Sequence, residues 1–491
     1  MADVADRATG RQGAELAEYL TPDLCVIGAG AGGLAVAEAA RAAGASVLMV
    51  ERGRIGGNAL NSGMVPARAL AAAAARLDAI RDASRFGIAV DGARVSFRRV
   101  HEHVSQVITA LRPAASPAHL EAIGAELVAG TARFVDKRTL AAGDVQIRAH
   151  RYVIATGAAT RVPQIPGLDA VPFFTAETIL DNTRKLTHLL VIGGTAEALE
   201  LAQSYRRLGS AVTLVAPELP LATTDSDLAA VVLRRLAEEG VAIRAPASVV
   251  AIQPRSMGIG VMIAEGEAEE LLDVSHILVA TGRAPLLDGL DLDKAGIRRA
   301  KNDPSRLQLT GPLRTTNGRV FVIGDATGGG YSAASARAQA NELVRRAVLS
   351  LPWPGMPVPA VVHTSPPLAE VGLSEHLARR RFGTGFSVLR AGYGETDWAR
   401  TSRETYGVAK LIVDRNGTIL GAGIAGTGAS ELVALFSLAI AQRLKVTELA
   451  GFATASASLS QIANQLGETA LRLQGPPRWR AAWQKLVRAI G

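Results

Sequence analysis

The stretch Asp23-Leu-Cys-Val-Ile27, followed by Gly28-Ala-Gly-Ala-Gly-Gly33, decides the fold of this 491-residue chain. The first segment is apolar and typical of a short buried strand, and the residues from Leu34 to Ala43 have the apolar spacing of a helix. A second strand, Ser46-Val-Leu-Met-Val50, ends at Glu51. Strand, glycine turn, helix, strand and acid in this order predict a dinucleotide-binding unit of the α/β class.

Each glycine of this turn has a predicted role. Gly28 allows the tight turn, Gly30 lets the backbone approach a pyrophosphate, and Gly33 lets the helix pack closely on the sheet. The N–H groups at the start of the helix then face the phosphates. Glu51 lies about 20 residues downstream, where a carboxylate binds the hydroxyl pair of a ribose. We therefore expect a nucleotide cofactor at this turn.

A second, weaker unit begins near residue 188. Its strands are expected at 188–192 and 211–215, and the turn between them reads Gly193-Gly-Thr-Ala-Glu-Ala198. Thr195 stands at the second glycine position of the fingerprint, so its Cβ is expected where a phosphate would approach. The position of the acid holds Ala216, and Glu218 follows two residues later. The residues predict either nicotinamide binding or a Rossmann-like domain that has lost its nucleotide.

Three further buried strands end in residues suited to cofactor contacts. Tyr152-Val-Ile-Ala-Thr-Gly157 and Ile277-Leu-Val-Ala-Thr-Gly282 share the same Ala-Thr-Gly turn. This repetition indicates two related nucleotide domains. The segment 318–325 is another predicted strand, and it ends in Asp325, whose carboxylate can bind a sugar-like chain.

Composition narrows the class of protein further. The chain is 48% hydrophobic and 20% charged, which suits large buried cores. Its net charge is 53 − 45 = +8, but the basic residues are dispersed, so no nucleic-acid partner is expected. No apolar run approaches the ~20 residues that span a bilayer, and residues 1–7 lack the apolar core of a signal peptide, which predicts a soluble cytoplasmic protein. The single Cys25 excludes an intramolecular disulfide and a zinc site built on cysteines, and no metal site is predicted.

Several motifs occur in a fixed order along the chain. They are the first glycine turn with Glu51, the segment Gly56-Gly-Asn58 to Arg68, Gly130-Thr-Ala-Arg-Phe134, the two Ala-Thr-Gly turns, Gly324-Asp325, and Val362-His-Thr-Ser-Pro-Pro-Leu-Ala-Glu-Val-Gly-Leu-Ser-Glu375. Together they resemble the flavoproteins with two dinucleotide-binding domains, the pyridine nucleotide-disulfide oxidoreductase family, and within it mercuric reductase and dihydrolipoamide dehydrogenase. The resemblance implies FAD in the first domain, NAD(P)H in the second, and a homodimer formed through the third.

The resemblance also implies an order of domains. The FAD-binding domain is expected at 1–160 and again at 285–350, interrupted by an NAD(P)-binding domain at 161–284. The prolines of 351–359 mark a boundary, after which an α+β dimerisation domain is expected at 351–474. Clear strands are predicted at 409–414 and 419–425, followed by a long apolar helix at 430–444.

Site residues follow from the same resemblance. Besides the first turn and Glu51, the expected contacts to FAD or to the nucleotide are made by Gly57, Asn58, Arg68, Ala132, Thr156, Gly157, Gly193, Gly194, Gly282, Gly324, Asp325 and Ala333. Arg68 occupies the family's lysine position and Glu200 its glutamate position, beside the reactive edge of the flavin. We expect Arg68 to tune the flavin and Glu200 to orient Arg68, with a purely structural ion pair as the alternative. Ala196 replaces a bulky gate over the ring.

The departures from the family pattern concern a single functional unit. Ala59 and Met64 stand where the family has its two redox cysteines, and neither side chain can form a dithiol. Ser456 and Gln461 stand where the family has a histidine and a glutamate that serve those thiols. The joint loss of thiols, acid and orienting carboxylate favours a changed electron acceptor over random decay.

The residues beyond 474 extend past the part of the chain that the family pattern covers. Trp479, Ala482, Trp483, Leu486, Val487 and Ile490 recur at helical spacing among arginines and a lysine. This pattern predicts an amphipathic helix at 475–491, which either contacts a membrane surface through 476–490 or packs on the protein itself.

The leading hypothesis is an FAD-dependent NAD(P)H oxidoreductase that passes electrons to a small acceptor such as a quinone, without a disulfide. The alternatives are a flavin-bearing binding or assembly protein, motivated by Thr195 and Ala216, and hydride exchange between nucleotides.

Overall fold

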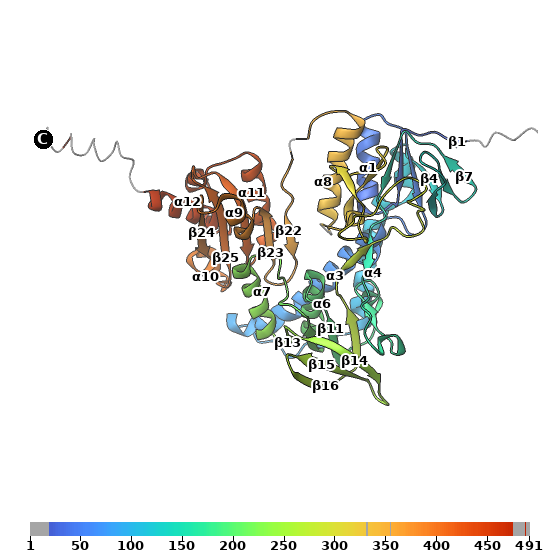
Figure 1. Ribbon diagram of the computed structural model, residues 1–491. Coiled ribbons are helices and arrows are strands. Elements are labelled where there is room, and N and C mark those ends of the chain that lie inside the picture. Colours follow the sequence, from blue (N-terminus) through green and yellow to red (C-terminus); the bar gives the residue numbers. More distant parts are fainter. Residues whose placement is uncertain (1–18, 330–331, 354, 475–486, 488–491) are drawn as a thin grey trace, which may run out of the picture.

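The structure is a computed structural model that describes residues 19–329, 332–353, 355–474 and Val487. The amphipathic helix expected at 475–491 therefore lies, apart from Val487, outside the described residues. Three α/β bodies make up the molecule, and the third of them lies at the opposite side from the first (Figure 1).

The first body is built on a seven-stranded sheet. In spatial order its strands are β19 (Leu309–Gly311), β20 (Arg314–Thr315), β21 (Val320–Val322), β8 (Arg151–Ile154), β2 (Leu24–Ile27), β3 (Val47–Glu51) and β4 (Glu126–Ala129). All four residues of the central strand β2 are buried, because the sheet is covered on both faces. Helices α1 (Ala31–Ala42) and α8 (Ala333–Leu343) lie side by side on one face (Figure 1).

The other face and edge of this body carry small elements. A four-stranded sheet is formed by β1 (Tyr19–Leu20), β7 (Val145–Ile147), β6 (Leu140–Ala142) and β5 (Ala132–Phe134). A two-stranded sheet joins β9 (Ala158–Thr160) to β18 (Arg283–Pro285), so the chain segments entering and leaving the second body pair with each other.

The second body repeats the same plan. Its parallel sheet has the order β10 (Phe174–Thr175), β17 (His276–Val279), β11 (His188–Ile192), β12 (Ala211–Val215) and β13 (Val241–Arg244). Helices α6 (Ala196–Arg207) and α7 (Ser226–Glu238) pack on it, and an antiparallel sheet of β14 (Ser248–Pro254), β15 (Ile259–Glu265) and β16 (Ala268–Val274) covers the other side. The two predicted strand–turn–helix–strand units are confirmed.

The third body holds a five-stranded antiparallel sheet. Its strands are β22 (Ala360–Val362), β23 (Leu368–Gly372), β26 (Ile419–Ala425), β25 (Val408–Asp414) and β24 (Phe386–Gly392). The helices of this body are α9 (Glu375–Phe382), α10 (Asp397–Thr401), α11 (Ala429–Ala441) and α12 (Gln461–Gln474). Apolar residues of α11 and α12 form one core with the sheet.

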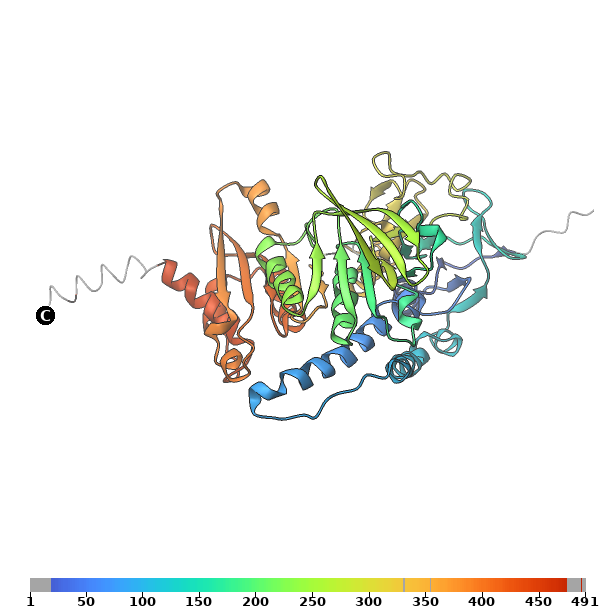
Figure 2. The same cartoon turned by 90° about the horizontal axis from the view of Figure 1, so that it is seen from below.

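A long helix links the first two bodies. Helix α3 (Met64–Asp82) follows the short α2 (Gly57–Asn61) and packs against both α6 and α4 (Phe97–Leu111), which precedes α5 (Pro117–Ala122). Figure 2 shows α3 extending from the first body along the second. Its first turns therefore stand between the main sheets of the first and second bodies.

Two predicted elements are shorter in the structure. The strand expected at 318–325 ends at Val322, because Gly324 has φ +62° and begins a 3-10 turn over Gly324–Thr327. The helix expected at 430–444 ends at Ala441, and Arg443 adopts φ +54°.

In the described part of the chain, no helix is both long and apolar enough to cross a membrane.

Candidate functional site

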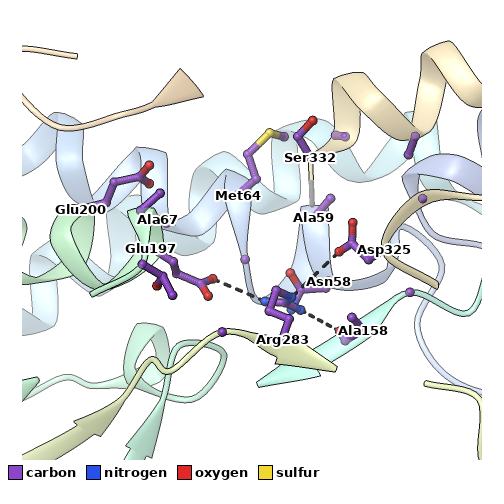
Figure 3. Close-up of a pocket in the computed structure, with 18 of the residues that line it drawn as sticks. Asn58, Ala59, Met64, Ala67, Ala158, Glu197, Glu200, Arg283, Asp325 and Ser332 are labelled. Carbon is purple, nitrogen blue, oxygen red and sulfur yellow. Dashed lines mark hydrogen bonds and ion pairs between the residues drawn. The ribbon is translucent and has the colours of Figure 1, made fainter. Parts of the chain in front are cut away.

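One cavity of about 1190 Å³ collects most of the predicted site residues. Both glycine turns, the start of α3 and the segment around β22 form its walls, as Figure 3 shows in part. The predicted residues that line it are Gly28, Gly30, Glu51, Gly57, Asn58, Arg68, Thr156, Gly157, Gly193, Gly194, Glu200, Gly282, Gly324, Asp325 and Ala333. Gly33 lies beneath the first turn, and Ala132 lines a smaller adjoining cavity of about 70 Å³. Residues from distant segments thus meet at one site.

The first glycine turn has the geometry that its sequence predicts. Gly28 has φ +104°, and a Cβ there would lie 2.5 Å from the carbonyl oxygen of Ala155. A Cβ on Gly33 would overlap the carbonyl oxygen of Gly28, so only glycine allows α1 to start this close to the sheet. A Cβ on Gly30 would meet no atom nearer than 3.8 Å. The space above Gly30 is therefore left for a ligand.

Polar groups around this turn fit a dinucleotide. The Glu51 carboxylate accepts hydrogen bonds from Ala29 N at 2.6 Å and from Gly53 N at 2.7 Å, which fixes it at the cavity wall. The hydroxyl of Thr156 is buried and has no hydrogen-bond partner among the described residues. Gly30 caps α1 without a side-chain hydrogen bond, so the first N–H groups of the helix stay available to phosphates. The residues present fit FAD: the start of α1 would hold its diphosphate, and Glu51 would hold its ribose.

The second glycine turn differs at Thr195. Its hydroxyl donates to the carbonyl oxygen of Ala280 at 3.0 Å and accepts from Ala198 N at 3.2 Å. The side chain is thus held against the end of β17 and caps α6. The cap uses one of the N–H groups that a phosphate would otherwise bind.

Arg68 and Glu200 face the same cavity without touching. In the part of the chain that the structure describes, no ion pair joins Arg68 to Glu200, which differs from the expected pair. Glu200 instead accepts the backbone N–H of His363 at 2.7 Å. Burial raises the pKa of Glu200 to about 7, and the His363 hydrogen bond and the positive charge of Arg68 act against that rise. Arg68 is exposed to the cavity.

The positions of the family's cysteines lie in the cavity wall. Ala59 on α2 and Met64 at the start of α3 line it, and Met64 is 47% exposed (Figure 3). Cys25 is fully buried in β2, and burial raises the pKa of its thiol, so it is an inert core residue. Ser456 and Gln461 are absent from the residues that line the cavity in the described chain.

The sequence reasoning missed Arg283, which follows the second Ala-Thr-Gly turn. Its guanidinium lies 3.2 Å from Glu177. It also lies 3.4 Å from Glu197 and 3.9 Å from Asp325, and it donates to the carbonyl oxygen of Ala158 at 2.7 Å (Figure 3). Its side chain is only 9% exposed. Arg283 therefore joins Asp325 of the first body to Glu197 of the second.

The pKa values of the three carboxylates around Arg283 are shifted in different directions. Burial raises the pKa of Glu197 and that of Asp325, and Arg283 only partly offsets the rise. Burial acts to raise the pKa of Glu177 as well, but the hydrogen bond from Thr160 and the charge of Arg283 hold it below the usual value. A charged residue directly after a predicted glycine turn was the signal in the sequence.

His363 is the second missed residue. It follows β22 and lines the cavity beside Glu200. Its Nδ1 is buried and has no hydrogen-bond partner among the described residues. Burial, followed by the charge of Arg68, lowers the pKa of its imidazole to about 4, so the ring is neutral at neutral pH.

The fold and this cavity define an FAD- and nucleotide-binding oxidoreductase scaffold. The chain belongs to the pyridine nucleotide-disulphide oxidoreductase family. The sequence model of the family matches residues 22–340, and the model of its dimerisation domain matches residues 358–464. Members of the family bind FAD and NAD(P)H, and the dimerisation domain supports a homodimer.

Particular relatives agree with this assignment. A mercuric reductase of Streptomyces lividans is 32% identical over 439 residues, covering 87% of this chain and 92% of the relative. A dihydrolipoyl dehydrogenase of Thermus scotoductus is 32% identical over 441 residues, with 87% and 93% covered. Among solved structures, the HOCl-induced flavoprotein disulfide reductase RclA from Escherichia coli superposes with a TM-score of 0.79 at 26% identity, covering 91% of this chain and 99% of that one. The fold class and the family predicted from the sequence are confirmed.

Proposed function

We propose that the protein is an NAD(P)H:acceptor oxidoreductase that reduces a small acceptor such as a quinone without a redox disulfide. The overall reaction converts NAD(P)H, a proton and a quinone into NAD(P)⁺ and a hydroquinone, so two electrons and two protons reach the acceptor. FAD, when bound, supplies the two-electron carrier between nucleotide and acceptor. The chain's own residues bind, orient and provide charge.

The observation that carries this proposal is the cavity wall at Ala59 and Met64. Both side chains line the cavity beside the first glycine turn, where a dithiol relay would have to lie, and neither can form one. The chain's single cysteine, Cys25, is enclosed in β2 and cannot replace it. Removing the relay leaves the cavity open to an acceptor that takes electrons directly.

Arg68 and Glu200 provide the electrostatics. The guanidinium of Arg68 has no ion-pair partner within the described residues, so its charge remains available to negative charge that develops in the cavity. Glu200, with a pKa of about 7, holds or releases a proton near neutral pH within the field of Arg68. Both groups therefore suit a reaction in which charge and protons change.

The test is anaerobic rapid mixing of the FAD-loaded protein with NADH and with NADPH. We expect at least one nucleotide to bleach the flavin absorbance, and the colour to return on adding a quinone and not on adding lipoamide or glutathione disulfide. Recovery with a disulfide alone would contradict the proposal.

A second candidate is a flavin-bearing binding protein. Thr195 favours it, because its hydroxyl takes the Ala198 N–H at the start of α6. Failure of both nucleotides to bleach the flavin would support this candidate over the enzyme.

A further inference from the structure

We propose that His363 binds the carbonyl oxygen of the nicotinamide carboxamide, as a neutral hydrogen-bond donor. The inference rests on the proposed function, since it requires that the cavity accepts NAD(P)H. It adds His363 to the residues that bind the nucleotide, and it explains why a histidine follows β22 at the cavity wall.

The backbone around His363 is fixed to α6 at several points. His363 N donates to Glu200, and two residues later Ser365 N donates to Gln203 Oε1 at 2.8 Å while Gln203 Nε2 donates to Ser365 O at 2.7 Å. Arg207 adds a hydrogen bond to the same carbonyl oxygen at 3.3 Å. The backbone that carries the imidazole is therefore held at a set position relative to α6, as the backbone of a binding residue needs to be.

The tautomer follows from the surroundings of the ring. Nδ1 is enclosed and has no partner among the described residues, so a proton on Nδ1 would be a buried, unsatisfied donor. Such a donor costs about 1–3 kcal/mol, whereas an unsatisfied acceptor is better tolerated. The proton of the neutral ring therefore belongs on Nε2. Because His363 lines the cavity and Nε2 is not among the buried unsatisfied atoms, the Nε2–H is available to a ligand there.

The position along α6 identifies the ligand. The second glycine turn, Gly193-Gly194, lies at the start of this helix, and Glu197 and Glu200 line the cavity on its first and second turns. A dinucleotide held by its diphosphate at the turn would therefore lie along the cavity wall that α6 forms, with its other end near Glu200. His363, whose backbone N–H donates to Glu200, lines the cavity at this end of the dinucleotide. The group that a dinucleotide presents there is the nicotinamide ring with its carboxamide, whose oxygen accepts a hydrogen bond.

Equilibrium binding tests the assignment apart from turnover. The FAD-loaded wild type, His363→Phe and His363→Gln are titrated by calorimetry with the oxidised form of whichever nucleotide reduces the flavin. The same proteins are titrated with the ADP-ribose moiety of that nucleotide, which lacks the nicotinamide. We expect His363→Phe to bind the full nucleotide about tenfold more weakly, equivalent to about 1.4 kcal/mol, and the ADP-ribose moiety unchanged. His363→Gln keeps an N–H donor and should recover part of the loss.

The matched control is His103→Phe, an exposed histidine on α4 outside the cavity, which should bind both ligands like the wild type. Equal affinity of His363→Phe and wild type for the full nucleotide would overturn the inference while leaving the proposed function intact. So would a loss confined to the reoxidation of the flavin by quinone. If the wild type bound no nucleotide, the proposed function itself would fail.

Discussion

Replacing Arg283 by methionine removes the cation that faces Glu177, Glu197 and Asp325 and keeps most of the side-chain volume. The three carboxylates lie within 4 Å of the guanidinium, whose side chain is 9% exposed. Breaking a buried pair by removing one partner costs about 3–5 kcal/mol, because the remaining charges stay in a poorly solvated place. We expect Arg283→Met to lower the free energy of unfolding by about 3 kcal/mol near pH 8.

The size of this penalty should depend on pH. Glu197 and Asp325 have raised pKa values in the folded protein, so their contribution to stability falls as pH rises through those values. The positive charge of Arg283 lowers both pKa values and so reduces this loss of stability. In Arg283→Met the loss is larger, because that charge is gone. Glu177 has a lowered pKa, so the stability that Arg283 gives it is fully present above the unfolded pKa and contributes at both test pH values. The response of Glu197 and Asp325 therefore makes the penalty larger at about pH 8 than at about pH 5.

Urea unfolding of the FAD-loaded proteins at both pH values measures this difference. The control is Arg299→Met, which removes an ion pair to Asp288 whose side chains are 40% and 97% exposed, and which should change stability little at either pH. A penalty for Arg283→Met that matches the control, or that stays the same at both pH values, would refute the reasoning.

Four other outcomes follow from the site. Arg68→Met should slow flavin reduction by NAD(P)H about tenfold in rapid mixing, equivalent to about 1.4 kcal/mol of barrier, whereas Arg68→Lys should stay near the wild-type rate. Equal reduction rates for the two variants would show that the positive charge at this position does not affect flavin reduction. The reduction rate of the wild type should change across about pH 7, where Glu200 ionises, and the profile of Glu200→Gln should be flat there; a retained inflection assigns it to another group. Gly33→Ala should be purified without FAD, as its absorbance spectrum would show, because the new Cβ overlaps the carbonyl oxygen of Gly28; normal FAD content would contradict that geometry. Cys25 should react with an alkylating reagent only after denaturation, and modification of the native protein detected by mass spectrometry would place the thiol outside the core.

The first glycine turn could be predicted from the sequence because its information is local. The positions of Gly28, Gly30 and Gly33 are separated by fixed short intervals, and the strands on either side are continuous apolar runs. The structure accordingly places α1, β2 and β3 within three residues of the predicted limits.

Side-chain direction could not be predicted in the same way. The sequence places Thr195 in the second glycine turn, but it does not show that the hydroxyl donates to the carbonyl oxygen of Ala280, which is distant in sequence. The sequence likewise does not show that Glu200 accepts the backbone N–H of His363, or that no ion pair joins Glu200 to Arg68 among the described residues. A single sequence shows neither partner.

The ion-pair cluster around Arg283 was missed altogether. Arg283 meets carboxylates from residues 177, 197 and 325, which belong to three separate parts of the chain. Its position after a glycine turn is visible in the sequence, but its partners depend on how the first two bodies pack together. His363 lies in a recognised motif, and only the buried state of its Nδ1 distinguishes it from a structural residue.

The absence of a thiol relay is tested most directly by counting the electrons that the FAD-loaded protein accepts. An anaerobic titration with dithionite, followed by flavin absorbance, gives the number of electrons taken up per FAD before free reductant appears. The replacement of the family's cysteines by Ala59 and Met64 predicts two electrons per FAD, since no disulfide is present to take a second pair. An uptake of four electrons per FAD would show a second two-electron centre in the protein and would contradict the account.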